Sequence, residues 1–398
     1  MRQSLRRWAA LGLVFVTVGL SAAMVSPYLT LFLDDAVGAD ATQVAVLLVV
    51  APLSSVVVSA IIGRISDRLP SRRGLLTGAA LAGCASSALA AVVRDYWAFL
   101  IITITLTACA QAMLPQMFAY ARESVTEPDR VAMTMSTLRT LFSLAWVAGP
   151  PLASVLLTTG GFTLTFTTSS LMYATAAAVA YLALRGRRAA VSDDGPTVDG
   201  HGADAPRRTI WSNLAVFVLT WAATNLAVQS LPLFTTRELG HGVGSAGLLL
   251  GLCAGLEIPI MIGLGVLSLR IPVGRLLIVG AGCGFAYMTL VCFATDLWQL
   301  AAGQVLNATA IAALSGLGIT YMQDMMPRDR GRASTLYTNS IPIGGLLAGP
   351  VLGAAQQAGY RLPYAVAALC YVVALGLLVL ARTGGSGGSG ATIVVPMR

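Results

Sequence analysis

Charged side chains are scarce in this sequence. Of its 398 residues, 11% are charged and 56% are hydrophobic, whereas about 25% are charged in an average soluble domain. The apolar residues come in blocks of about 20, the length that crosses about 30 Å of hydrocarbon. A soluble chain of this size could not cover its surface with so few polar groups. We therefore predict an all-α integral membrane protein that crosses the lipid bilayer many times.

Residue types that carry out chemistry are missing or dispersed. The two histidines, His201 and His241, lie outside the predicted spans, which excludes a proton relay through membrane histidines. The six cysteines lie in apolar stretches without CxxC or Cys/His spacing, so we expect neither a disulfide framework nor a metal site. No nucleophile–base pair lies at membrane depth, and no GxxxxGK[ST] loop is present. We therefore expect that the protein is not an enzyme, needs no cofactor and does not use ATP directly. The lack of a soluble signalling domain argues against a sensor.

Lysine is absent, and the arginines are concentrated in alternate loops. With the N-terminus inside, all arginines lie at or near cytoplasmic ends except Arg94, Arg237 and Arg361, which lie outside, and Arg139, which lies within the membrane. This distribution follows the positive-inside rule and predicts that both termini are cytoplasmic. The arginines that give the net charge of +8 therefore serve to orient the helices in the membrane, and no nucleic-acid partner is expected.

Hydropathy predicts twelve membrane spans. They lie at roughly 8–33, 43–66, 74–93, 96–121, 132–157, 162–184, 210–236, 243–268, 273–293, 297–325, 333–357 and 361–382. The polar segment between the sixth and seventh spans divides the chain into an N-terminal six-helix bundle (1–185), a cytoplasmic linker (186–209) and a C-terminal six-helix bundle (210–382). A Gly/Ser-rich tail (383–398) follows.

The two halves repeat each other at an offset of 200 residues without a gap. Arg130 aligns with Arg330, Arg139 with Asn339, and Ala148-Gly149-Pro150 with an identical triplet at 348–350. We therefore predict two pseudo-symmetric bundles, with the substitution of Asn339 for Arg139 marking where the symmetry is broken.

The connection between the second and third spans has the pattern G-x-x-x-D-R-x-x-x-R-R. It contains Gly63, Asp67, Arg68, Arg72 and Arg73, and it resembles the signature loop of the major facilitator superfamily. The acid can accept hydrogen bonds from an arginine or a helix N-terminus, so this cluster is predicted to latch the halves together on the cytoplasmic side. The alternative is an ordinary basic loop. The superfamily's fold implies a substrate site near the midplane, between the halves.

Several amide, aromatic and basic side chains lie inside the predicted spans. Burying such groups without partners costs several kcal/mol, so they are candidates for a substrate site, although scattered polar groups also join helices to one another. Depth arithmetic places Gln116 level with Arg139, and Asn225 level with Glu257. The predicted substrate-binding residues are Tyr28, Gln111, Gln116, Arg139, Trp146, Trp221, Asn225, Gln229, Asn307 and Asn339.

Glu257 is the only acid well inside a predicted span. Burial disfavours the charged form of a carboxyl group, and Pro259 nearby loosens the helix. We predict that Glu257 is the proton-coupling residue, with the proton as the coupling ion. A structural acid, neutral or paired with Arg139, is the alternative, and a structural role for Arg139 also stays open.

The predicted site has amides and an arginine but no cluster of charge. Paired donors and acceptors suit hydroxyl groups, and Trp or Tyr can stack on the apolar face of a sugar. A small neutral, hydroxyl-rich solute fits this chemistry best.

Several sequence blocks resemble the sugar efflux transporter family of the major facilitator superfamily. They are Pro115–Ala119 with Ala121-Arg122-Glu123, Ser143–Val147 with Gly149–Ala153, Gly255–Pro259, and Gln323-Asp324 followed by Thr335–Asn339. The resemblance implies an exporter of sugars or glycosides in the bacterial inner membrane, driven by proton antiport. We also expect a monomer. Leu114 and Pro342 depart from the family pattern and leave the exact substrate open. An exporter of drugs or other small metabolites on the same fold is the alternative.

Overall fold

The computed structural model describes residues 2–68, 71–125, 128–184 and 204–383, and this part of the chain is helical with short connections. The helices are α1 (Arg2–Val25), η1 (Ser26–Tyr28), α2 (Leu29–Phe32), η2 (Leu33–Val37), α3 (Ala41–Arg68), α4 (Arg73–Val92), α5 (Tyr96–Ile102), η3 (Thr103–Thr107), α6 (Ala108–Gln111), α7 (Met113–Ser124), α8 (Pro128–Ala183), α9 (Arg207–Leu233), η4 (Phe234–Glu238), α10 (Val243–Leu267), α11 (Val273–Phe293), α12 (Leu297–Met325), α13 (Arg330–Ala358) and α14 (Leu362–Thr383).

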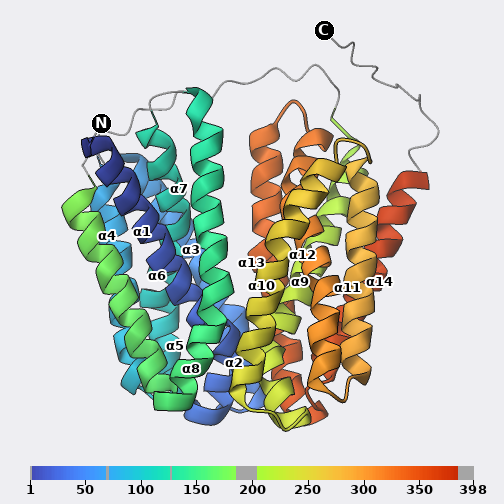
Figure 1. The fold of residues 1–398 in the computed structure, drawn as a ribbon, viewed down its shortest axis with the longest axis horizontal. Coiled ribbons are helices and arrows are strands. Elements are labelled where there is room, and N and C mark those ends of the chain that lie inside the picture. Colours follow the sequence, from blue (N-terminus) through green and yellow to red (C-terminus); the bar gives the residue numbers. More distant parts are fainter. Residues whose placement is uncertain (1, 69–70, 126–127, 185–203, 384–398) are drawn as a thin grey trace.

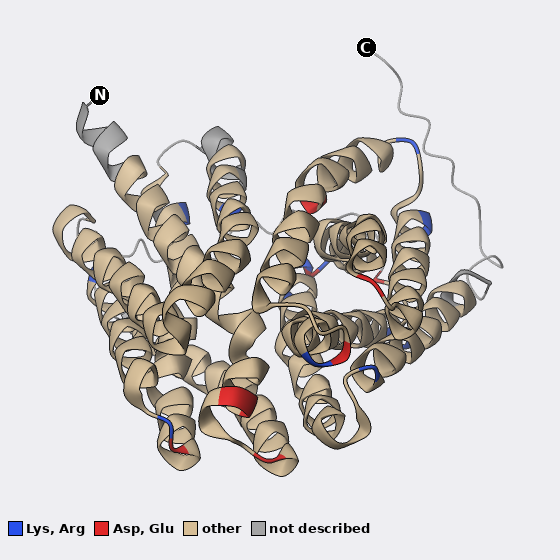
Figure 2. Ribbon diagram, turned by 60° about the horizontal axis from the view of Figure 1, so that its bottom comes forward, with Lys and Arg blue, Asp and Glu red and all other residues tan. Residues whose placement is uncertain are grey.

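The helices form two bundles that lie side by side (Figure 1). The first bundle contains α1 to α8, and the second contains α9 to α14. The chain enters α1 and leaves α14 on one side of the molecule, here called the terminus side, and the opposite side is called the far side. Most of the ribbon carries neither acidic nor basic residues (Figure 2), as a membrane environment requires.

Ten segments of the described chain are long and apolar enough to cross a membrane. One of them, 133–183, has 51 residues and would be about 77 Å long as a straight helix. Gly161 breaks it, with φ 64° and ψ −162°, a conformation open essentially to glycine alone. The break gives two antiparallel spans, and α13 is long enough to cross as well. The arrangement is compatible with the twelve predicted spans, and the predicted all-α fold is confirmed.

Each bundle packs its helices through small residues that meet large ones. A Cβ added to Gly83 on α4 would lie 2.6 Å from the ring of Tyr173 on α8. In the second bundle, a Cβ on Gly318 of α12 would lie 2.7 Å from the ring of Phe217 on α9. Since lipid chains are as apolar as the side chains, close packing of this kind is what holds membrane helices together.

Two far-side arginines cap the third crossing helix of each bundle in the same way. Arg94 donates to the α4 carbonyls of Ala90 and Ala91 at 2.9 Å, and its guanidinium lies 5.4 Å from the ring centroid of Phe32. In the second bundle, Arg361 donates to the carbonyl oxygens of Cys292 and Ala294 at the end of α11, and lies 5.6 Å from the ring of Phe234. A guanidinium thus satisfies carbonyl groups that a helix end leaves without partners.

Candidate functional site at the junction of the bundles

The two bundles meet along two helix pairs, α8 with α10 and α3 with α13. A stripe of glycines at four-residue spacing lines each contact: Gly247, Gly251 and Gly255 on α10, and Gly345, Gly349 and Gly353 on α13. Glycines four residues apart lie on one face of a helix and let two backbones approach closely.

The contact is close on the far side and loosens toward the terminus side. On α10, an added Cβ would lie 2.6 Å from Pro150 O at Gly247 but 3.9 Å from Val147 at Gly255, and nothing lies within 4 Å at Gly263. On α13, a Cβ on Gly353 would lie 2.8 Å from Ala45, and one on Gly345 would lie 3.7 Å from Pro52. Figure 1 shows the same divergence of the bundles toward the terminus side.

A buried apolar cluster on the far side joins the two bundles. Met24, Leu31 and Ala153 of the first bundle pack with Leu233 and Ala246 of the second. Tyr28 belongs to this cluster and is 2% exposed, and its hydroxyl group donates to the carbonyl oxygen of Pro150 at 3.0 Å. The structure therefore places Tyr28 in the closed far-side contact.

Opposite charges from the two bundles lie near each other where the junction loosens. Glu257, on α10, is within electrostatic range of Arg139, on α8, and accepts a hydrogen bond from Ser315 on α12 at 3.5 Å. Arg139 also lies within range of Tyr337 on α13, whose hydroxyl group donates to Leu314 O at 3.0 Å. Arg139 is exposed while Glu257 is partly buried, and their helices belong to different bundles.

The predicted polar face of α9 carries a buried polar atom without a partner. The side-chain oxygen of Gln229 makes no hydrogen bond to the described residues, and the indole nitrogen of Trp221 lies beside the Tyr337 hydroxyl group. One turn from Trp221, the amide nitrogen of Asn225 donates to the Trp221 carbonyl at 2.9 Å. An unpaired buried donor or acceptor costs about 1–3 kcal/mol. A face of this kind is suited to a polar ligand that supplies the missing partner.

Asn307 belongs to a buried chain of hydrogen bonds within the second bundle. Its amide nitrogen donates to Cys253 Sγ at 3.3 Å and to Gln304 Oε1 at 3.1 Å. Gln304 in turn donates to the Tyr287 hydroxyl group at 3.0 Å. Because Cys253 is one turn from Glu257 on the same face of α10, this chain holds the helix that carries the acid against α12 and α11.

Gln116 is placed in the first bundle, near the terminus side. It is 7% exposed, and its side-chain oxygen accepts from Ser66 and from Arg72, each at 2.8 Å. The partners that hold the Gln116 side chain are therefore Ser66 and Arg72. Among the other predicted binding residues, Gln111 and Asn339 are exposed and Trp146 is partly buried. Their roles stay predictions.

The predicted cytoplasmic latch is described only in part. The side chains of Asp67 and Arg68 lie outside the described residues. Arg73 stacks 4.6 Å from the ring centroid of Tyr181 within the first bundle, and nothing lies within 4 Å of a Cβ added to Gly63. Described contacts of Arg72 and Arg73 are therefore to their own bundle, and the latch stays a prediction.

Sequence reasoning missed Ser315 and Tyr337, which surround the charged pair. It placed Arg237 on the outside but missed the pairing of Arg237 with Asp34 and Asp35, which lie within helical turns that continue the seventh and first spans. The sequence signal that could have indicated this pairing was two adjacent acids at the end of one span and a basic residue at the equivalent end in the other half.

Comparison with known proteins fits this architecture. The family model of the Major Facilitator Superfamily matches residues 11–295. Sugar efflux transporter A of Escherichia coli (strain K12) is 33% identical over 372 residues, which cover 92% of this chain and 94% of the relative. The chain belongs to the sugar efflux transporter family of the major facilitator superfamily. It is therefore a multi-pass membrane transporter and not an enzyme.

Other members of the family match at similar levels. Sugar efflux transporter B of Salmonella typhimurium (strain LT2) is 33% identical, with 88% of each chain covered. A putative sugar efflux transporter of Deinococcus radiodurans is 33% identical, with 94% of this chain and 97% of the relative covered.

Solved structures share the fold at low sequence identity. A mutant of the nucleoside transporter NupG aligns with a TM-score of 0.77 at 12% identity, covering 94% of this chain and 99% of that one. A bacterial homologue of the human lysosomal transporter Spinster, in an inward-facing and occupied conformation, aligns with a TM-score of 0.74 at 14% identity, covering 94% and 96%.

Proposed function

We propose that this protein exports sugars or glycosides across the bacterial inner membrane by alternating access, in exchange for protons. Relatives that match nearly the whole chain are named sugar efflux transporters, and the junction of the bundles has the chemistry of a polyol site. Its free donors and acceptors are uncharged apart from one arginine and one acid, which suits a neutral, hydroxyl-rich solute.

One relationship between the bundles supports the mechanism: Arg139 on α8 and Glu257 on α10 lie within electrostatic range of each other. The solute site includes Arg139 from the first bundle and Trp221, Asn225 and Gln229 from the second. A solute bound by both bundles biases their relative position, because it binds one arrangement of its partners better than another.

Proton coupling follows from the same pair. When Glu257 is ionised, its charge attracts Arg139 and draws α8 and α10 together near the site. A proton on Glu257 removes that attraction and also removes a carboxylate acceptor for solute hydroxyl groups, so protonation releases the solute, as exchange for protons requires. Proton and solute therefore act on one equilibrium, which is the condition for coupled transport.

The terminus side is cytoplasmic in this proposal, since most arginines lie at that side and positive residues favour the cytoplasm. The far side, where the bundles are closed, then faces outward, and the described conformation opens toward the cytoplasm. A monomer suffices, because both halves of the site are on one chain.

Proteoliposomes test the proposal. Purified protein is reconstituted, the vesicles are loaded with labelled lactose, glucose, arabinose or a thioglycoside, and a pH gradient is imposed. We expect gradient-stimulated movement of at least one of these solutes, and movement without the protein serves as the blank. Absence of stimulated movement for every solute would refute the functional proposal.

A further inference from the structure

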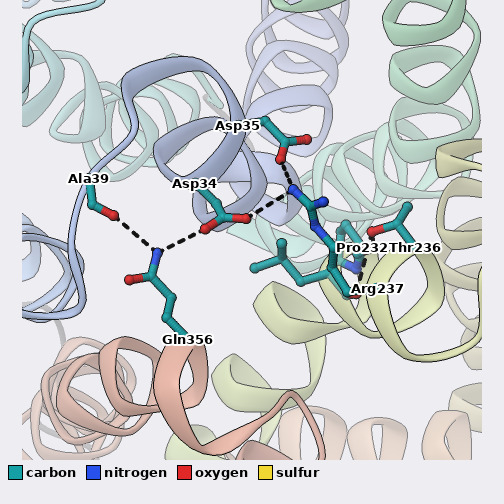
Figure 3. A network of polar contacts seen from close by, with 8 residues as sticks. Asp34, Asp35, Ala39, Pro232, Thr236, Arg237 and Gln356 are labelled. Carbon is teal, nitrogen blue, oxygen red and sulfur yellow. Dashed lines mark hydrogen bonds and ion pairs between the residues drawn. The ribbon is translucent and has the colours of Figure 1, made fainter.

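A polar network joins the two bundles on the far side, at the ends of their first helices (Figure 3). The Arg237 guanidinium of η4 pairs with Asp34 at 3.3 Å and also with Asp35, both in η2. From α13, Gln356 Nε2 donates to the other oxygen of Asp34 at 3.1 Å and to the Ala39 carbonyl at 3.2 Å. Asp34 thus binds two separate segments of the second bundle.

The elements that carry these charges are equivalent in the two halves. η2 and η4 are both five-residue π-helical turns at the end of the first span of a bundle. Each is followed by a glycine with a left-handed backbone, Gly38 at φ 68° and Gly240 at φ 67°. Equivalent elements face each other across the junction, so identical sequences would bring like charges together. One copy instead carries Asp34 and Asp35, and the other carries Arg237. The adjacent Glu238 pairs with Arg361 within the second bundle.

We propose that Asp34, Asp35, Arg237 and Gln356 form a latch that holds the far side of the transporter closed and releases when that side opens. All four lie on the side where glycine contacts bring the backbones together, and the two ion pairs and the Asp34–Gln356 bond each span both bundles. No solute is needed for this role, so the latch is independent of the identity of the transported molecule.

The exposure of the network suits a contact that must break in every cycle. The side chains of Arg237, Asp34 and Asp35 are 51%, 22% and 38% exposed. Water and salt screen charges at such positions, so each pair is weak. The latch therefore biases the closed state without trapping it.

A cysteine introduced at a buried position in the far-side contact can be modified only when that side opens, so its modification rate reports opening. Ser154, on α8, is 4% exposed, and its side chain touches the α10 backbone at Gly247. In purified protein carrying Ser154→Cys, the rate of modification at position 154 by a water-soluble maleimide is read by peptide mass spectrometry. Native cysteines remain in place because the modified peptide is identified directly.

The latch predicts an order of rates set by charge at position 237. Compared with Ser154→Cys alone, we expect Arg237→Lys to change the rate little, Arg237→Gln to raise it about twofold to fivefold, and Arg237→Glu to raise it further. High salt should speed modification of the parent and leave Arg237→Gln unchanged. Asp35→Asn should raise the rate in the parent but not in Arg237→Gln, as paired residues do in a double-mutant cycle.

Asp95→Asn is the matched control. Asp95 is an exposed far-side acid that caps α5 by accepting from the Ala98 amide at 2.9 Å, and asparagine caps helices equally well. We expect no change in rate. The proposal is overturned if Arg237→Gln and Arg237→Glu react at the parent rate, or if Asp95→Asn raises the rate as much as Asp35→Asn does.

Discussion

Arg139 on α8 and Glu257 on α10 lie within electrostatic range of each other across the junction of the two bundles. Their helices also make a close far-side contact, at Gly247 and Gly251. Any rocking of one bundle against the other changes the separation of these two charges. The pair therefore converts the relative position of the bundles into a change in electrostatic energy.

Replacing the acid should separate proton coupling from solute binding. In Glu257→Gln, we expect loss of pH-driven sugar movement while sugar exchange across equal pH is kept, because glutamine retains the acceptor for Ser315 but binds no proton. Both are measured with labelled sugar in proteoliposomes. Glu238→Gln, on the far side within one bundle, should keep driven transport. Unchanged driven transport in Glu257→Gln would remove this residue from the coupling mechanism.

Removing the arginine should weaken sugar binding. A hydrogen bond from a charged donor contributes about 1.5–3 kcal/mol, so we expect Arg139→Ala to reduce affinity by about tenfold or more, measured by calorimetry on the purified protein. Arg139→Lys keeps the charge but not the planar fork of donors, so its affinity for sugar should lie between those of the parent and Arg139→Ala. A folded Arg139→Ala variant with the parent affinity would assign this residue a structural role.

Two glutamines should respond in opposite ways to the same substitution. Gln229 has a buried oxygen without a partner, so Gln229→Leu should leave thermal stability unchanged or raise it while weakening sugar binding. Gln304 bonds to both Tyr287 and Asn307, so Gln304→Leu should lower stability by about 1–3 kcal/mol. Thermal unfolding in detergent and sugar binding check both. Destabilisation by Gln229→Leu comparable to that by Gln304→Leu would contradict the assignment of Gln229 to an unfilled site.

A larger side chain in the glycine stripe should force the far side apart. A Cβ on Gly251 would lie 2.6 Å from Pro151 and 3.0 Å from the Val147 carbonyl oxygen, and overpacking costs about 1–3 kcal/mol. We expect Gly251→Val to lengthen the distance between spin labels at Thr159 and Gln357, measured by pulsed dipolar spectroscopy.

Gly263→Val is the control for that substitution. Gly263 is on the same helix, but nothing lies within 4 Å of its added Cβ. The spin-label distance in this variant should match that of the parent. Equal lengthening in both variants would show that the effect comes from the helix itself and not from the junction.

The helical framework could be predicted because it depends on patterns within single segments. Apolar runs and basic loops predicted each crossing, and the offset of 200 residues predicted two similar bundles. Span ends differed where the chain continues as a helix past the apolar run. The turns η2 and η4 extend the first and seventh spans to Val37 and Glu238, which brings Asp34 and Arg237 into helical segments.

The site could be predicted only where one helix determines it. The period of Trp221, Asn225 and Gln229 predicted a polar face on α9, and its role in binding stays a prediction. Gln116 shows the limit, since depth arithmetic predicted its level in the membrane but not its hydrogen-bond partners, Ser66 and Arg72. Depth alone does not say which way a side chain points around its helix.

The caps made by Arg94 and Arg361 have a consequence for how the two halves are compared. Arg94 follows the helix it caps, whereas Arg361 reaches α11 from the turn before α14. An alignment of the halves, position by position, would count both arginines as mismatches. In space they occupy corresponding places, each over the phenylalanine at the end of its bundle's first span. The pseudo-symmetry of the two halves thus extends to a three-dimensional contact that each half makes from a different segment.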